Sequence, residues 1–285
     1  MASKKKTLGQ VLIYTILSLW ALLAIYPFFW VIINSFKVNK YIRANTFAIP
    51  TGEMFTLDNY IEAFERVNIF AAYRTSLVIS ISVTVAVVII AGLAAYGMAR
   101  YDFRGRKFLQ SMIIASMMFP VFSTIIPVFR MMYGWGIVQF DNLSLSMLCV
   151  ILPQIAGNLS FAMVVLMGFI RGIPIELEEA AYLEGYSVFQ IFWKIVFPLA
   201  RPSFATVSIF TFLWSYNDLF TQKFFLRNSM TYSVTRLLEE ISSQAGTNYG
   251  LMVSSVVLVV VPVLVVYVLL QKNIIKGMTV GAMKG

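Results

Sequence analysis

Histidine is missing from this chain of 285 residues, and cysteine occurs only once, as Cys149. The chain therefore lacks the usual acid–base side chain near neutral pH and the commonest ligand of transition metals. A single cysteine cannot form a disulfide within the chain. Cys149 lies in an apolar run, which favours a buried core residue over a reactive thiol. No catalytic residue and no metal site is expected.

Charged residues are also scarce, at 12% of the chain, whereas 59% of the residues are hydrophobic. Soluble domains carry about 25% charged residues, so a soluble protein of this size could not cover so much apolar surface. We therefore expect the chain to lie in membrane lipid. The net charge of +9 would raise the question of nucleic acid in a soluble protein. Here the basic residues cluster beside apolar runs, which favours the membrane surface and no nucleic acid.

Long windows without Asp, Glu, Lys or Arg predict six transmembrane helices. A helix needs about 20 apolar residues to cross a hydrocarbon core about 30 Å thick. Five such windows occupy residues 7–36, 75–99, 108–129, 142–170 and 241–271. A sixth, shorter run begins at Pro202 and meets Asp218, which would lie near an interface or face the protein interior. The predicted fold class is all-α, a polytopic membrane protein.

Six spans place both termini on the same side of the membrane. With the termini in the cytoplasm, the inner segments carry 13 of the 22 Lys and Arg residues, and the outer segments, including 37–74 and 221–249, carry 9. The bias is modest in total and strongest in the short basic loop 100–107, which is typical of a cytoplasmic loop.

The inner loop 171–198 has the pattern of two short helices joined by a sharp turn. Pro174 suits a first helical position, and the acidic residues after it favour the start of a helix. Gly185 can end that helix in a left-handed conformation. Ser187 and Gln190 form the capping box of a second helix, which runs to Pro198. Such a compact amphipathic loop is suited to docking in a groove of a cytoplasmic protein.

Six residues of this loop follow the pattern E-A-A-x3-G-x9-I-x-L-P. They are Glu179, Ala180, Ala181, Gly185, Ile195 and Pro198. The loop therefore resembles the EAA loop of ATP-binding-cassette (ABC) importer permeases, with Phe197 in place of the usual leucine. The resemblance implies that these six residues couple the chain to an ATPase subunit.

Three other segments resemble the carbohydrate branch of these permeases, the maltose type: residues 50–60, 214–218 and 276–285. The likeness covers essentially the whole chain and implies the fold of a type I ABC importer permease with six spans. It also implies the organisation of the chain. Residues 1–74 would hold the N-terminal tail, the first transmembrane helix and an external segment. Residues 75–270 would form the permease core, with the EAA loop at about 171–200, and 271–285 a cytoplasmic tail.

The resemblance also implies partners. A second permease subunit would complete the pore in the cytoplasmic membrane, two cytoplasmic ABC ATPase subunits would bind the EAA loops, and an extracytoplasmic solute-binding protein would deliver the sugar substrate, expected to be an oligosaccharide. The chain has no G-x-x-x-x-G-K-[ST] sequence to hold a nucleotide. We therefore expect no cofactor and no enzyme activity in this chain, with ATP and Mg²⁺ bound by the partner ATPase.

Polar and aromatic residues inside the predicted spans are candidates for lining a sugar pore, because an amide that faces lipid is costly. The candidates are Gln154, Asn158, Trp214, Asn217 and Asp218. For a serine or threonine, such as Thr124, a hydrogen bond to its own helix is the favoured interpretation.

Several other functions are weighed against this one. An ion-coupled secondary transporter usually needs ionisable groups near the bilayer centre, and Asp218, near the end of its run, is the single candidate. A membrane enzyme would need clustered carboxylates, an activated nucleophile or metal ligands, and none is visible. A protein-export or structural subunit is a third alternative. Within the importer family, glycerol phosphate or a polyol is an alternative substrate.

Overall fold

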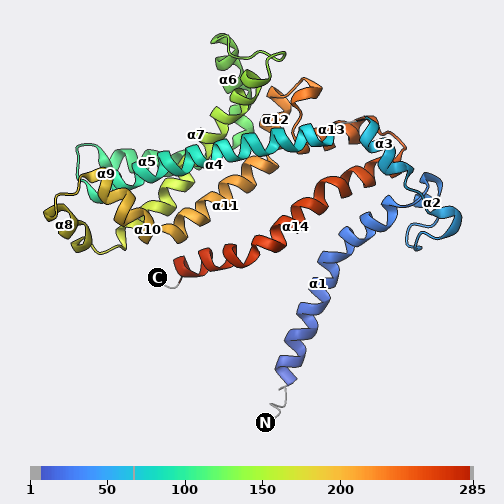
Figure 1. Cartoon of the computed structure of the whole chain (residues 1–285), viewed down its shortest axis with the longest axis horizontal. Helices are drawn as coiled ribbons and strands as arrows, with labels where there is room; N and C mark the ends of the chain where they lie inside the picture. Colours follow the sequence, from blue (N-terminus) through green and yellow to red (C-terminus); the bar gives the residue numbers. More distant parts are fainter. Residues whose placement is uncertain (1–7, 67, 283–285) are drawn as a thin grey trace. The chain divides into compact units, whose positions relative to one another are not determined.

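The computed structural model describes residues 8–66 and 68–282, and it divides into two compact units. One unit comprises Met1–Val67 and Leu238–Leu264, and the other Asn68–Leu237 and Val265–Gly285. The described residues form helices, joined by turns and loops, and a single isolated antiparallel bridge between Lys37 and Phe55, with no strand among them. Figure 1 shows these helices along the chain, and they confirm the all-α prediction.

The first unit contains α1 (Leu8–Ser35), α2 (Asn39–Ala44), a 3-10 turn (Gly52–Met54) and α3 (Asp58–Arg66). Helix α3 lies within the segment 37–74 that the sequence places outside the membrane. Two further helices, α13 (Val234–Gln244) and α14 (Tyr249–Ala282), each contain residues assigned to both units.

The second unit contains three long helices and a series of short ones. The long helices are α4 (Ile69–Arg100), α7 (Leu143–Arg171) and α11 (Arg201–Asn217). The short ones are α5 (Arg106–Ser116), α6 (Val121–Gly134), α8 (Glu176–Leu183), α9 (Val188–Ile191), a π-helical turn (Phe192–Val196), α10 (Phe197–Leu199), α12 (Leu219–Phe225) and a 3-10 turn (Ser229–Thr231).

Within the described part of the chain, three helices are each long and apolar enough to cross a membrane: Gly9–Ser35 of α1, α4 and α7. The segments Val188–Leu199 and Arg201–Asn217 qualify together as one broken span, with a bend of 81° between them. The amino-terminal part of α14 is a shorter apolar stretch, Tyr249–Val265. The number of six spans stays a prediction.

The predicted span at residues 108–129 is divided between two helices. Helix α5 ends at Ser116, and α6 begins at Val121, directly after Pro120. Proline lacks a backbone N–H and crowds the preceding turn of a helix, and at Pro120 the backbone is extended, so the helix is interrupted here. The window is therefore apolar throughout but is not one continuous helix.

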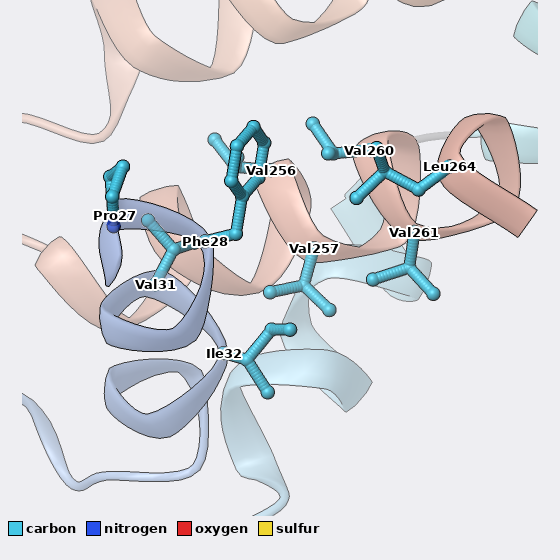
Figure 2. A pocket seen from close by; sticks show the side chains of 9 residues that line it. All are labelled: Pro27, Phe28, Val31, Ile32, Val256, Val257, Val260, Val261 and Leu264. Carbon is cyan, nitrogen blue, oxygen red and sulfur yellow. The ribbon is translucent and has the colours of Figure 1, made fainter. Parts of the chain in front are cut away.

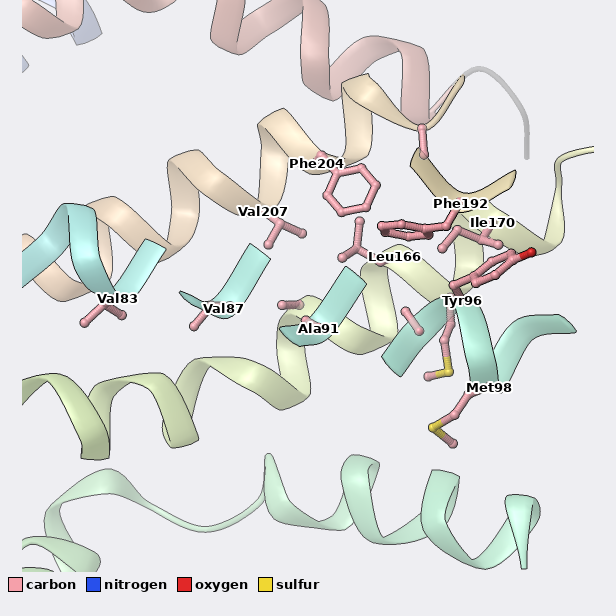
Figure 3. Close-up of a cluster of buried hydrophobic side chains, with 14 of the residues drawn as sticks. Val83, Val87, Ala91, Tyr96, Met98, Leu166, Ile170, Phe192, Phe204 and Val207 are labelled. Carbon is pink, nitrogen blue, oxygen red and sulfur yellow. The ribbon is translucent and has the colours of Figure 1, made fainter. Parts of the chain in front are cut away.

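The core of the second unit is formed where α4 packs along α7 and α11 (Figure 3). Val83, Val87 and Ala91 recur every four residues on α4, so they share one face of that helix, and all three are fully buried. A Cβ atom on Gly92 would come within 2.8 Å of the Phe204 ring. The absence of a side chain at Gly92 thus allows Phe204 to pack directly against the α4 backbone, as small residues do in membrane helix pairs.

In the first unit, a buried lysine follows the end of α1. The Lys37 ammonium donates hydrogen bonds to Oδ1 of Asn34 at 3.1 Å and to the carbonyls of Asn45 and Thr46, each at 2.9 Å. Burial lowers the pKa of Lys37 from its ordinary value of 10.5. The three acceptors match the three donors of the ammonium, and two of them follow the carboxyl end of α2, where the helix dipole favours a cation.

Asn59 of α3 links three segments of the same unit. Its Nδ2 donates to the carbonyls of Ser35 at 2.9 Å and Lys37 at 2.8 Å, and its carbonyl accepts from Oγ of Ser254 at 3.0 Å. Asn59 also fills the space above Gly250, where an added Cβ would lie 2.2 Å from its Oδ1. The end of α1, α3 and the start of α14 are therefore joined by one residue, through its side chain and its backbone carbonyl.

Residues of α1 and α14 in the same unit line a small apolar cavity of about 150 Å³ (Figure 2). Its lining comprises Pro27, Phe28, Val31, Ile32, Val256, Val257, Val260, Val261 and Leu264. All nine side chains are hydrocarbon, so this cavity offers nothing to recognise a polar solute.

We predict that Lys37→Met lowers the stability of the protein, because it removes the donor from the buried side chain of Asn34 and from the partly buried hydrogen bonds to the carbonyls of Asn45 and Thr46. The expected loss is about 3 kcal/mol in free energy of unfolding, measured by thermal unfolding in detergent. The matched control is Lys40→Met, since Lys40 is exposed. Equal stability of the two variants would contradict the structural role given to Lys37.

Candidate functional site

The loop between α7 and α11 folds as its sequence pattern predicts, with small shifts at its boundaries. Helix α8 begins at Glu176, two residues after Pro174. Gly185 has φ +87°, the left-handed conformation expected at the end of this helix. Ser187 and Gln190 form the predicted capping box at the start of α9. The second helix continues from α9 through the π-helical turn into α10 rather than as one regular helix.

The six motif residues divide between the surface of this loop and its inner side. Glu179, Ala180 and Gly185 are exposed, and Ala181 is buried. Ile195 and Pro198 are partly buried. The first three are therefore accessible to another protein, whereas the last three pack within the chain.

Three large apolar side chains are exposed beside the accessible motif residues. Leu183 is 88% exposed, and Tyr182 and Phe189 are each 67% exposed. We call the surface formed by Glu179, Ala180, Tyr182, Leu183, Gly185 and Phe189 the docking face. Clustered apolar groups on such a surface are typical of a protein interaction site.

A buried ion pair ties the inner side of α8 to the end of α4. Nε of Arg100 lies 2.7 Å from Oε1 of Glu178, and both side chains are less than a tenth exposed. Nη2 of Arg100 donates to the carbonyl of Ile173 at 2.8 Å, and the Tyr96 hydroxyl donates to Oε2 of Glu178 at 3.0 Å. The loop is thus anchored to the carboxyl end of α4 through Glu178 and the carbonyl of Ile173.

The sequence alone did not identify this anchor. In the sequence, Glu178 is one of several acidic residues at a helix start, and Arg100 is one of several basic residues in the loop 100–107. The available signal was the position of Arg100 at the end of a long apolar run, where a charged side chain needs a partner. The partner is 78 residues away in sequence.

A second candidate site is a cavity of about 640 Å³ within the second unit, a volume typical of small-molecule sites. Its lining comes from the α5–α6 segment, α7, α11 and α12. The lining residues are Ser116, Met117, Phe119, Phe122, Thr124, Ile125, Val128, Pro153, Gln154, Ala156, Gly157, Asn158, Phe161, Trp214, Ser215, Asp218, Phe220, Thr221 and Phe225.

A hydrogen-bonded network lies on one side of this cavity. Nε2 of Gln154 donates to Oδ2 of Asp218 at 2.8 Å, and Oε1 of Gln154 accepts from Oγ of Ser215 at 2.6 Å. The backbone N–H of Thr221 donates to Oδ1 of Asp218 at 3.1 Å. Nδ2 of Asn158 donates to the carbonyl of Gln154 at 2.7 Å. The network joins α7, α11 and the start of α12.

Aromatic rings supply the apolar part of the lining. Phe161 and Trp214 meet edge to face with their centroids 4.7 Å apart, and Phe122 and Phe220 do so at 4.5 Å. Rings fixed by such pairs present rigid apolar faces. The combination of aromatic faces with a few fixed polar groups is typical of a site for a polar organic ligand.

Four of the five predicted pore residues line this one cavity: Gln154, Asn158, Trp214 and Asp218. The fifth, Asn217, is exposed outside the lining, and its Nδ2 donates to the carbonyl of Leu213 at 2.8 Å. Among the residues that the structure describes, no cluster of His, Cys, Asp or Glu could hold a metal ion. Whether the lining residues contact a substrate stays a prediction.

Comparisons with known proteins agree with the geometry. The permease protein NgcG of the diacetylchitobiose uptake system of Streptomyces coelicolor is 29% identical over 95% of this chain and 88% of its own length. The permease protein YtcP of a polygalacturonan/rhamnogalacturonan transport system in Bacillus subtilis is 30% identical over 99% of this chain and 100% of its own length.

The fold is shared with a solved bacterial ABC transporter involved in the import of the acidic polysaccharide alginate. The two chains superpose with a TM-score of 0.74 at 21% identity, over 95% of this chain and 98% of the other. The family model described as "binding-protein-dependent transport system inner membrane component" matches residues 87–280. Because this match covers more than half of the chain, the protein belongs to the family of inner membrane components of binding-protein-dependent transport systems.

Proposed function

We propose that this chain is the permease subunit of an ATP-driven importer for a carbohydrate and forms half of its pore. The observation that carries the proposal is the exposed docking face on a loop anchored by a buried ion pair. The relatives named above support the substrate class, since NgcG and YtcP are both named for the uptake or transport of a saccharide. The cavity lined by rings and polar groups has the composition that such a substrate needs.

The proposed energy source is a separate protein. Two cytoplasmic ABC ATPase subunits would bind ATP and Mg²⁺, and one would dock on Glu179, Leu183 and Gly185. A second permease subunit would complete the pore, and an extracytoplasmic binding protein would deliver the sugar. In this proposal the chain itself has no catalytic role.

The anchor explains how such docking could move the pore. Arg100 and Glu178 join α8 to α4 through a charge-assisted bond in a nearly dry environment. Helix α4 packs in turn against α7, which supplies Gln154 and Asn158 to the cavity. A displacement of the docking face would therefore reach the cavity through packed helices rather than through a flexible loop.

The docking role predicts that Gly185→Trp uncouples the complex. A tryptophan here would obstruct the docking face and strain a left-handed residue, so coupled ATP hydrolysis should fall by roughly tenfold or more, as for a central interface contact. Gly105→Trp is the matched control, because Gly105 is also an exposed loop glycine with positive φ, outside the docking face. Normal coupling in Gly185→Trp, measured on membranes that contain the whole complex, would refute the docking role.

The anchor role predicts that Glu178→Ala loosens the loop, since it leaves the buried Arg100 guanidinium without its partner. The expected cost is about 3–5 kcal/mol, seen as faster proteolysis within residues 171–200 and a lower ratio of transport to ATP hydrolysis. The double variant Arg100→Met, Glu178→Met should recover much of this loss, because neither charge then remains buried. Glu176→Ala, on the exposed side of α8, is the control. If Glu178→Ala and Glu176→Ala had equal effects on proteolysis and on coupling, the anchor would have no role in the mechanism.

The proposed orientation places both termini in the cytoplasm and residues 221–249 outside. In intact cells, Thr247→Cys should react with a membrane-impermeant thiol reagent and Glu184→Cys should not, although both positions are exposed. The native Cys149 is buried, so labelling of the wild-type protein gives the background signal. If only the cysteine at position 184 were labelled, the proposed orientation would be wrong and the opposite one would hold.

A further inference from the structure

Asp218 is the one ionisable side chain among the residues that line the larger cavity, as far as the described chain shows. The lining contains no lysine, arginine or histidine and no second carboxylate. The remaining lining is aromatic, aliphatic or neutral polar. The charge that a ligand meets on this chain's side of the cavity is therefore negative.

The carboxylate of Asp218 is held in place by hydrogen bonds to both of its oxygens. Oδ2 accepts from Gln154 and Oδ1 accepts from the backbone of Thr221. An ionised carboxylate is an acceptor at both oxygens, which is the arrangement seen here. Gln154 is itself fixed by Ser215, so the negative group has little freedom to turn away from a ligand.

Each of the two side-chain amides beside Asp218 already donates one hydrogen bond within the protein. Nε2 of Gln154 donates to Asp218, and Nδ2 of Asn158 donates to the carbonyl of Gln154. An anionic ligand would therefore meet a fixed carboxylate on this wall without a cationic side chain to balance it. At a separation of about 5 Å and an effective dielectric constant of about 20, the repulsion between two carboxylates weakens binding by roughly a hundredfold.

The same wall suits an uncharged sugar. Hydroxyl groups can donate to the carboxylate of Asp218, which has lone pairs beyond those used by its two protein donors. The rings of Phe161, Trp214 and Phe220 offer apolar faces to the hydrocarbon side of a pyranose. Repulsion by Asp218 would be absent for such a ligand.

We propose that Asp218 selects against acidic sugars, so that the carbohydrate carried through this cavity is a neutral or N-acylated oligosaccharide. The inference rests on the proposed function and narrows its substrate. Similarity alone does not decide this point, since the relatives include a system named for neutral diacetylchitobiose and one named for acidic polygalacturonan. The charge of the cavity wall favours the neutral class.

The test measures sugar binding to the assembled complex of this chain, its second permease and its ATPase subunits, without the binding protein. Thermal stabilisation by millimolar disaccharide reports binding directly. The probes are three neutral disaccharides (diacetylchitobiose, maltose and arabinobiose) and one acidic disaccharide of similar size, digalacturonate. Omission of the binding protein ensures that the discrimination observed belongs to the membrane complex.

The variants separate charge from structure. Asp218→Asn removes the charge and keeps the shape, Asp218→Glu keeps the charge, and Asp141→Asn is the control on an exposed acid outside the cavity. We expect the wild-type complex to bind at least one neutral disaccharide and to bind digalacturonate far more weakly. Asp218→Asn should raise the affinity for digalacturonate relative to the neutral sugar by about tenfold or more, whereas Asp218→Glu and Asp141→Asn should retain the discrimination.

Two results would overturn the inference and leave the proposed function intact: wild-type affinity for digalacturonate equal to that for the neutral sugars, or an unchanged affinity ratio in Asp218→Asn. Uptake into proteoliposomes that also contain the binding protein, assayed with the same probes, tests the proposed function separately. Absence of both binding and uptake for every carbohydrate would refute the proposed function and the inference together.

Discussion

The close packing of α4 against α7 and α11 is the constraint on which the docking loop and the cavity both depend. Lipid offers no partner for a backbone polar group, and a helix satisfies these groups within itself. Helices in lipid associate through close contact of small residues. Gly92 provides such a contact for Phe204 of α11. The same α4 carries Tyr96 and Arg100 at its end, and α7 carries Gln154 and Asn158. One packed group of helices therefore positions both sites.

Much of this fold could be predicted because its determinants are local. Charge-free windows predicted α1, α4 and α7, and the turn at Gly185 and the capping box of Ser187 and Gln190 depend on residues only a few positions apart. The break at Pro120 was different. Prolines are tolerated inside membrane helices, as Pro153 is within α7, so a proline in an apolar window predicts either a kink or an interruption. Which of the two occurs depends on the packing around it.

The sequence predicts individual residues of the candidate site, but it does not predict which of them contact one another. Gln154 and Asp218 were each chosen because an amide or a carboxylate is costly in lipid, yet their contact joins positions 64 residues apart, which no local pattern specifies. Asn217 adjoins Asp218 in sequence, but Asp218 leaves the helix and caps α12, whereas Asn217 remains the last residue of α11 with its side chain bonded to Leu213. Neighbouring residues thus face different surroundings at a helix end.

The π-helical turn Phe192–Val196 determines the rotational phase between the docking loop and α11. A π turn accommodates one residue more than a regular α-helical turn, and each residue of an α-helix advances by about 100° around its axis. Removal of one residue from this turn would restore a regular helix and rotate α9 by about that angle relative to α10. Phe189 would then point in a different direction while every side chain of the docking face remained present. The length of this one turn is therefore as much a part of the docking surface as the identity of its residues.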